Sequence, residues 1–218
     1  MKHHFIRCNQ TEVLELIFAG WGMDYNLFIK EKGENDLCIC YDYTDLTFDS
    51  SVLKTYKEIR LIAWSFGVWV AATILSHLNL PISRSIAING TLFPVNEEKG
   101  ISPTIFTGTL RGLSSKTIEK FNRRMCGTKE NKLLFDSNST ERTFESIEGE
   151  LRALSMHFNN YPIPAFQYNT AVIGDRDLIF LPEKQLEGWK NQSVHLLKEP
   201  NMFHYPVHFL KYLFICRL

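Results

Sequence analysis

The sequence lacks an excess of charge of either sign and has no long hydrophobic run. It carries 24 basic and 24 acidic residues among 218, so its formal net charge is zero. A neutral chain has no overall field that attracts nucleic acid or an anionic membrane, so an acidic partner would have to be recognised by a local basic patch. The amino-terminal residues lack the apolar core of a signal peptide, and no stretch approaches the length of a membrane span. We therefore expect a cytoplasmic protein with no membrane or nucleic-acid partner.

Cysteine is also scarce. The five cysteines are an odd number, which does not suit a framework of disulfide bonds. Cys38 and Cys40 lie two apart in an apolar run, where both side chains would point to one face of a strand. We expect reduced thiols in the core rather than a disulfide or a metal site. With 44% hydrophobic residues, the chain has enough apolar material for one domain with a sizeable core.

Short apolar runs alternate with segments of helical length. The runs have the length and composition of strands and cover residues 5–8, 13–19, 37–41, 59–64, 85–88, 171–173 and 194–197. Helices are expected at 68–78, 182–189 and 206–215. This alternation predicts an α/β fold with a mostly parallel central sheet flanked by helices. Between about residues 93 and 166 helical periodicity replaces the strand pattern, so we expect one domain, residues 1–218, with a helical insertion there.

Ser65 stands where an apolar strand runs directly into a helix. Ala63 and Gly67 place small residues two positions before and two positions after it. A nucleophile elbow needs this context, because the strained serine lifts its hydroxyl above the sheet and bulky flanking residues would collide with neighbouring elements. A serine at this place can also simply cap the following helix. The strand, the helix and the two small neighbours together favour Ser65 as a nucleophile.

A tight turn, Gly20-Trp21-Gly22, follows the first long apolar run. In hydrolases with a nucleophile elbow, one donor to the oxyanion is the N–H of the residue after the nucleophile, here Phe66. The second donor comes from the loop after an earlier strand, here Trp21. On its own such a turn is a weak signal, but its position before the elbow strengthens the interpretation.

The acid and the base are expected late in the chain, in the order serine, carboxylate, histidine. Asp175 and Asp177 follow the strand near residue 173, and either can be the acid. A helix that begins at Pro206 would leave His204 in the preceding loop and place His208 in its first turn, so we select His204 as the base. The spacing of the two histidines imitates a zinc pair, but Tyr205 stands where the metalloprotease motif needs a glutamate. No metal is expected.

Several motifs together resemble the BioG family of biotin synthesis, and the resemblance spans nearly the whole chain. The motifs are Phe18-Ala19-Gly20-Trp21-Gly22-Met23-Asp24, Ala63-Trp64-Ser65-Phe66-Gly67-Val68-Trp69, Ala87-Ile88-Asn89-Gly90-Thr91, Ile173-Gly174-Asp175-Arg176-Asp177 and Phe203-His204-Tyr205-Pro206. That family is similar in fold and role to the BioH esterases and cleaves the methyl ester of pimeloyl-acyl carrier protein. The resemblance implies an α/β-hydrolase fold and a serine esterase without a cofactor.

By the same resemblance, Ser65, Asp177 and His204 form the catalytic triad, and Trp21 and Phe66 supply the oxyanion hole. The sequence alone leaves Asp175 open as the acid. Trp21, Asn89 and Phe93 are expected to contact the substrate. Three further aromatic residues, Phe106, Tyr161 and Phe166, are candidates to line an acyl channel, although each can equally be ordinary core.

The predicted insertion holds the local basic patch. Residues 111–132 include only two acidic residues but seven basic ones, which are Arg111, Lys116, Lys120, Arg123, Arg124, Lys129 and Lys132. On the helix expected there, Lys120, Arg123 and Arg124 lie opposite an apolar face. Such a stripe is often only solvated surface. Because an acyl carrier protein is strongly acidic, the resemblance implies that this basic face docks it.

Two other functions stay open. One is a general carboxylesterase or thioesterase that acts on small acyl substrates without a carrier, since a triad and an oxyanion hole do not encode the leaving group. The other is a hydrolase fold that binds a ligand without catalysis. The presence of every catalytic residue type in the expected order argues against the second.

Overall fold

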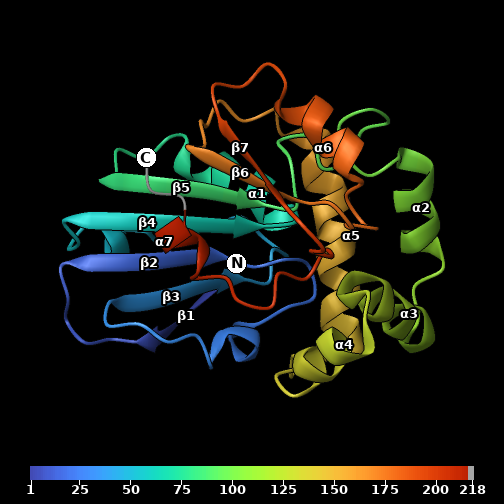
Figure 1. Ribbon diagram of the computed structural model, residues 1–218, viewed down its shortest axis with the longest axis horizontal. Coiled ribbons are helices and arrows are strands. Elements are labelled where there is room, and N and C mark those ends of the chain that lie inside the picture. Colours follow the sequence, from blue (N-terminus) through green and yellow to red (C-terminus); the bar gives the residue numbers. More distant parts are fainter. Residues whose placement is uncertain (216–218) are drawn as a thin grey trace.

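The computed structural model describes residues 1–215, which form a seven-stranded sheet with helices on both sides (Figure 1). The strand order across the sheet is β1-β3-β2-β4-β5-β6-β7. The strands are β1 (Lys2–Arg7), β2 (Val13–Phe18), β3 (Asp36–Tyr41), β4 (Glu58–Trp64), β5 (Ile82–Ile88), β6 (Thr170–Gly174) and β7 (His195–Glu199). Only β1 is antiparallel to its neighbour, whereas every other pair is parallel. The predicted α/β class and the mostly parallel sheet are confirmed.

The helices connect these strands and cover the sheet. The α-helices are α1 (Phe66–Leu75), α2 (Pro103–Arg111), α3 (Ser115–Cys126), α4 (Lys129–Asp136), α5 (Phe144–Asn160), α6 (Pro182–Trp189) and α7 (Tyr212–Ile215), with short 3-10 helices η1 (Tyr25–Phe28) and η2 (Ser50–Leu53). None of the helices in this part of the chain is long and apolar enough to cross a membrane.

The strands bury both faces, as expected for a parallel sheet. Successive side chains alternate in direction, so Leu16 and Phe18 of β2 pack on one side, while Ile17 packs on the other. The first side is covered by α1 and α6, whose Trp69 and Trp189 are buried there. The second side is covered by the segment 202–213 and by η1.

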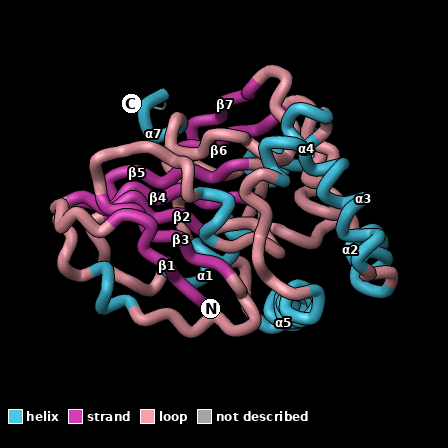
Figure 2. Tube along the Cα trace, turned by 90° about the horizontal axis from the view of Figure 1, so that it is seen from below, coloured by secondary structure: helices cyan, strands magenta, loops and turns pink. Residues whose placement is uncertain are grey.

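Helices α2 to α5 all lie between β5 and β6 in the sequence, and they gather beyond the carboxyl ends of the parallel strands (Figures 1 and 2). Local sequence explains where three of them begin. Ser114, Thr128 and Thr143 each accept a hydrogen bond from the backbone N–H three residues later, and Ser114 forms a full capping box with Thr117. The site described below lies beneath these helices.

The helix predicted at 206–215 is wrong for most of its length, because α7 covers only Tyr212–Ile215. Val207 has a φ of 42°, which no helical residue adopts. The carboxylate of Glu31 accepts hydrogen bonds from the backbone N–H groups of Phe209 and Leu210, at 2.8 and 3.3 Å. This distant side chain therefore replaces the hydrogen bonds that a helix would have supplied.

Candidate active site

Ser65 lies at the junction of β4 and α1, with φ 59° and ψ −129°, a strained conformation for a residue with a side chain. Two glycines make room for it. A Cβ atom on Gly67 would come within 2.5 Å of the carbonyl oxygens of Phe18 and Ala19, and one on Gly90 would collide with the carbonyl of Ser65. The turn can therefore press against the ends of β2 and β5 only because these positions have no side chain.

Three side chains from distant parts of the chain form one hydrogen-bonded series. The hydroxyl of Ser65 lies 3.0 Å from Nε2 of His204, and Nδ1 of His204 lies 2.8 Å from Oδ2 of Asp177. All three residues are buried. An ionised carboxylate can only accept, so Nδ1 carries the proton and Nε2 is free to accept from the serine hydroxyl. This arrangement can activate a hydroxyl as a nucleophile.

Asp177 is held by four donors. Its Oδ1 accepts from the backbone N–H groups of Ile179 and Phe180, at 2.7 and 3.0 Å. Its Oδ2 accepts from Nε2 of Gln185 at 3.1 Å, in addition to His204. Asp175, the alternative acid, is exposed instead. The buried amide of Gln185 gave no signal in the sequence, because its role depends on the contact between α6 and the loop after β6.

His204 is fixed through its backbone and its ring. Its carbonyl accepts hydrogen bonds from the indole of Trp64 at 2.8 Å and from the amide of Asn89 at 3.0 Å. Its ring stacks on Phe180, with an interplanar angle of 7°. His208, the alternative base, is exposed in an irregular turn rather than in a helix.

Asn89 does not meet the expectation of a substrate contact. It is fully buried, with its amide bonded to the carbonyls of Phe203 and His204 and its oxygen accepting from the N–H of Gly174. The residue thus joins the ends of β5 and β6 to the histidine loop.

A cavity opens directly above the hydroxyl of Ser65. It encloses about 810 Å³ including its open mouth, and Ser65, His204, Trp21 and Phe66 lie in its wall. Apolar side chains make up most of the remainder, namely Ile101, Ile105, Phe106, Phe121, Met125, Leu151, Leu178, Ile179 and Leu181. Such a lining suits an aliphatic chain.

Of the aromatic residues proposed for an acyl channel, Phe106 lines this cavity. Phe93, Tyr161 and Phe166 are not in its wall. The ring of Phe93 lies under the ammonium of Lys99, and Phe166 packs on Tyr168. The sequence pointed to aromatics, but the wall holds more aliphatic than aromatic side chains, and several of them come from α2, α3 and the loop after β6.

Trp21 and Phe66 both line the cavity together with Ser65, and each has a backbone N–H group. Neither of these N–H groups has a hydrogen-bond acceptor among residues 1–215. Two unpaired N–H groups beside a nucleophile can stabilise a developing oxyanion.

The buried thiol of Cys126 offers no competing nucleophile, because burial raises its pKa to about 12.

The basic residues of α3 divide between the cavity and the surface. Arg124 is exposed and also borders the cavity, whereas Lys120 and Arg123 lie on the exposed side of the helix. Arg123 forms an ion pair with Glu119 at 3.0 Å. Within the described part of the chain, Lys120 and Arg124 have no ion-pair partner. No group of three or more potential metal ligands occurs within residues 1–215.

Comparison of the chain with known proteins identifies a family to which its sequence is similar. The family model described as pimeloyl-ACP methyl esterase BioG matches residues 1–212. A malonyl-[acyl-carrier protein] O-methyltransferase of Bacteroides fragilis is 46% identical over 176 residues, which are 80% of this chain but only 36% of that protein. The chain therefore spans about a third of the length of that relative.

Solved structures agree with the fold. The crystal structure of BioG from Haemophilus influenzae superposes with a TM-score of 0.87 at 36% identity, covering 95% of each chain. A lipase-esterase related protein of Clostridium acetobutylicum has a TM-score of 0.61 at 15% identity, covering 96% of this chain and 92% of that one. At that identity, the second likeness concerns the fold alone.

Proposed function

Because the chain belongs to the BioG family of pimeloyl-ACP methyl esterases, we propose that it hydrolyses the methyl ester of pimeloyl-acyl carrier protein in biotin biosynthesis. The products are pimeloyl-acyl carrier protein and methanol. The observation that carries the proposal is the hydrogen-bonded series Ser65–His204–Asp177 at the base of an apolar cavity. The family supplies the substrate, and the series supplies a mechanism for cleaving an ester.

The reaction is acyl transfer to serine followed by hydrolysis. His204 takes the hydroxyl proton of Ser65 as Oγ attacks the ester carbonyl carbon, and the carbonyl electron pair moves onto oxygen. The resulting tetrahedral intermediate collapses, and His204 returns the proton to the methoxide that leaves as methanol. Water then adds to the acyl-serine with the same histidine as base, which releases the carboxylate and restores Ser65. Asp177 holds the tautomer of His204 and stabilises its cationic form.

The N–H groups of Trp21 and Phe66 form the oxyanion hole in this proposal. Both residues line the cavity beside Ser65, and their N–H groups have no acceptor within the described residues. Loss of one such donor typically costs ~3 kcal/mol of transition-state stabilisation.

Helices α2 to α5 serve as a lid in this proposal, with the acyl chain in the apolar cavity beneath them. Ile105 of α2, Phe121 of α3 and Leu151 of α5 form part of the cavity wall. When an aliphatic acyl chain packs against such residues, each Å² of apolar surface removed from water contributes roughly 25 cal/mol of favourable free energy. We also propose that residues 1–218 form one domain and that the lid is an insertion into it at about 93–166.

The acidic acyl carrier protein docks on α3. Lys120, Arg123 and Arg124 present positive charge on the exposed side of this helix, and Arg124 also borders the cavity that the acyl chain would enter. A carrier that sits on this face can therefore deliver its acyl group to Ser65.

The free thiols of Cys38, Cys40 and Cys126 support a reducing compartment, which we take to be the cytoplasm.

The Bacteroides relative is named as an O-methyltransferase that acts on malonyl-[acyl-carrier protein]. Most of that protein lies outside the matched region, so its methyl-transfer activity is not carried over to this chain. The geometry of this chain suits cleavage of an ester, because Ser65 is hydrogen-bonded to His204 and lines one cavity together with Trp21 and Phe66.

Hydrolysis of the methyl ester of pimeloyl-acyl carrier protein by the purified protein tests the proposal. Methanol release and the mass of the carrier product are followed, with a short-chain methyl ester as the comparison substrate. We expect a far higher kcat/KM for the carrier-bound ester. Equal values for both substrates would favour a general carboxylesterase, and the absence of turnover and of Ser65 labelling by a fluorophosphonate would favour a non-catalytic binding module.

A further inference from the structure

The loop that carries Trp21 is attached to α5 and to the residues just before it. Residues 20–24, which we call the Trp21 loop, follow β2. Four of them are hydrogen-bonded to the segment 140–150. The bonds join the Trp21 indole to the Ile147 carbonyl (2.9 Å), the Gly22 N–H to Glu150 (2.9 Å), Arg142 to the Met23 carbonyl (3.4 Å), and both Thr140 and the Glu141 N–H to Asp24 (2.9 Å each).

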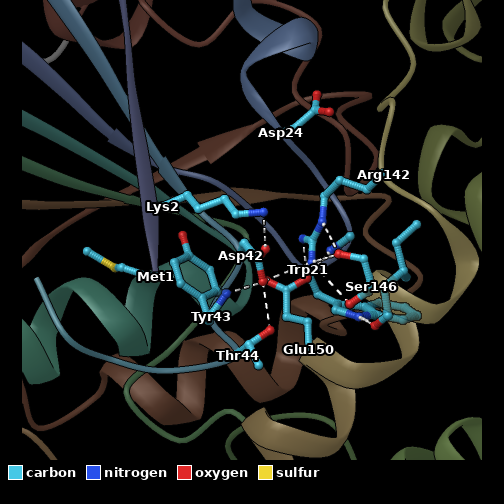
Figure 3. A network of polar contacts seen from close by, with 12 residues as sticks. Met1, Lys2, Trp21, Asp24, Asp42, Tyr43, Thr44, Arg142, Ser146 and Glu150 are labelled. Carbon is cyan, nitrogen blue, oxygen red and sulfur yellow. Dashed lines mark hydrogen bonds and ion pairs between the residues drawn. The ribbon is translucent and has the colours of Figure 1, made fainter.

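Glu150 is the centre of this attachment (Figure 3). Its side chain is completely buried and accepts three hydrogen bonds, from the N–H groups of Gly22 and Tyr43 and from the guanidinium of Arg142 at 2.6 Å. Gly22 follows β2 and Tyr43 follows β3, so one carboxylate from α5 holds the loops after two neighbouring strands.

Burying a charged group of this kind costs free energy, so packing alone does not explain why a glutamate occupies this position. Burial raises the pKa of Glu150, while Arg142 and the two N–H groups act in the opposite direction. Arg142 in turn contacts Asp42 at 3.1 Å, so its charge is shared between two carboxylates. A pair of hydrophobic residues could fill such a space at no loss of stability, whereas only a carboxylate can accept from two separate N–H groups and a guanidinium.

We propose that Glu150, supported by Arg142, is a positioning residue that holds the Trp21 N–H in the oxyanion hole. The inference rests on the proposed function. The Gly22 N–H belongs to the peptide group that follows Trp21, and the indole of Trp21 is bonded to Ile147. Both the backbone and the side chain of Trp21 are thus held by α5, while its own N–H has no acceptor among residues 1–215.

The same contacts link the lid to the chemistry. Glu150 and Ile147 belong to α5, and Leu151 of the same helix lines the cavity. A displacement of α5 would therefore move the oxyanion donor without disturbing the hydrogen bonds among Ser65, His204 and Asp177. Glu150 acts on the rate through Trp21 and touches no reacting atom.

The test compares Glu150→Gln with Glu15→Gln. Glu15 is an equally buried carboxylate, 2.7 Å from Arg7, but it lies in the amino-terminal half of β2, away from the Trp21 loop. We expect Glu150→Gln to lower kcat for a small methyl ester by about 10- to 100-fold, because a misplaced oxyanion donor loses part of its effect. KM should change by less than about twofold, and Glu15→Gln should leave kcat within about twofold of the wild type.

A trifluoromethyl ketone gives the second readout, since its hemiketal oxygen occupies the position of the oxyanion. Its affinity, measured by calorimetry, should fall in parallel with kcat/KM for Glu150→Gln and remain unchanged for Glu15→Gln. Arg142→Lys keeps a positive charge beside Glu150 but cannot make all the guanidinium contacts, and it should show a smaller loss in the same direction. This variant decides the matter if Glu150→Gln does not fold.

Wild-type kcat and ketone affinity in a folded Glu150→Gln or Arg142→Lys variant would overturn the inference. Failure of the wild-type protein to hydrolyse any ester would contradict the proposed function instead. Even then, the ketone titration compares the variants without any turnover.

Discussion

At the scale of single residues, the chemistry depends on how tightly each group beside Ser65 is held. Ser65 itself is strained, Asp177 accepts four hydrogen bonds, and the carbonyl of His204 accepts two. Groups that are already oriented do not have to reorganise as charge develops in the transition state. The hydroxyl of Ser65 faces the cavity, so it can be removed without leaving a gap in the core.

Ser65→Ala should therefore abolish ester hydrolysis while the fold persists. The expected loss of kcat is at least about 10⁴-fold, because the covalent route through the serine is closed. Turnover of the methyl ester and thermal unfolding are measured side by side. Substantial turnover by this variant would remove Ser65 from the mechanism.

The second prediction concerns the late carboxylates and histidines. Asp177→Ala and His204→Ala should each lower kcat by about 10³-fold or more, because these side chains are bonded to one another and to Ser65. Asp175→Ala and His208→Ala should have little effect, since both residues are exposed. The four values of kcat decide the assignment, and a larger loss for Asp175 or His208 would contradict it.

At the scale of elements, α3 joins two tasks on opposite faces. Phe121 and Met125 face the cavity, whereas Lys120 and Arg123 face solvent. The helix thus lies between the cavity and the surface that we propose for the carrier. Charged groups at the edge of such a surface act mainly on the rate of association and are screened by salt.

Reversing the charge of Lys120 and Arg124 should lower kcat/KM for the carrier-bound ester by about tenfold at low salt and leave a small ester unaffected. Arg123 is kept, because its reversal would also break the ion pair with Glu119. A matched control reverses Lys32 and Lys54, exposed residues that precede β3 and β4, at the opposite end of the parallel strands.

The wild-type value for the carrier substrate should fall as salt rises, and the Lys120 and Arg124 variant should lose most of this dependence. Equal losses on both substrates would mean that the helix supports the cavity structurally. No loss on either would make the basic face ordinary solvated surface.

At the scale of the whole molecule, buried polar groups hold the ends of the sheet. Asp36, the first residue of β3, accepts hydrogen bonds from the hydroxyl of Tyr56 at 2.8 Å and from the N–H of Asn9 at 2.8 Å. Burial acts to raise its pKa, but the hydrogen bonds from Tyr56, Thr11 and Asn9 outweigh it, so the pKa lies below the usual 3.8. A carboxyl whose pKa is depressed in the folded state stabilises the protein above its unfolded pKa, and this contribution is lost as the pH falls through the folded value.

Asp36→Asn should lower the free energy of unfolding by about 2 kcal/mol at pH 7, because the charged hydrogen bonds are weakened. The difference from the wild type should shrink as the pH falls below about 4, where the wild-type carboxyl also loses its charge. Urea unfolding at pH 7 and pH 3 measures both values. A difference that is the same at the two pH values would show that the charge of Asp36 does not contribute.

Much of the fold was predictable, since it follows from local patterns. The strands show in short apolar runs, and α6 was expected at its observed bounds because Pro182 begins it. The prediction of a helix at 206–215 was wrong for most of that range. The Glu31 carboxylate, 178 and 179 positions away in the sequence, accepts hydrogen bonds from two N–H groups of that segment. Asn89 and Phe93 were expected at the substrate, but their side chains have other partners.

The sequence by itself determined the sheet, the elbow at Ser65 and the late positions of an acid and a base, because periodicity, small flanking residues and chain order are local properties. Only the tertiary structure decided that Asp177 rather than Asp175 is bonded to His204, that Gln185 supports it, and that Glu150 holds the Trp21 loop. Glu150 and Gly22 are 128 positions apart in the chain. Contacts over such distances depend on how helices pack against the ends of strands, and no pattern within a single sequence records them.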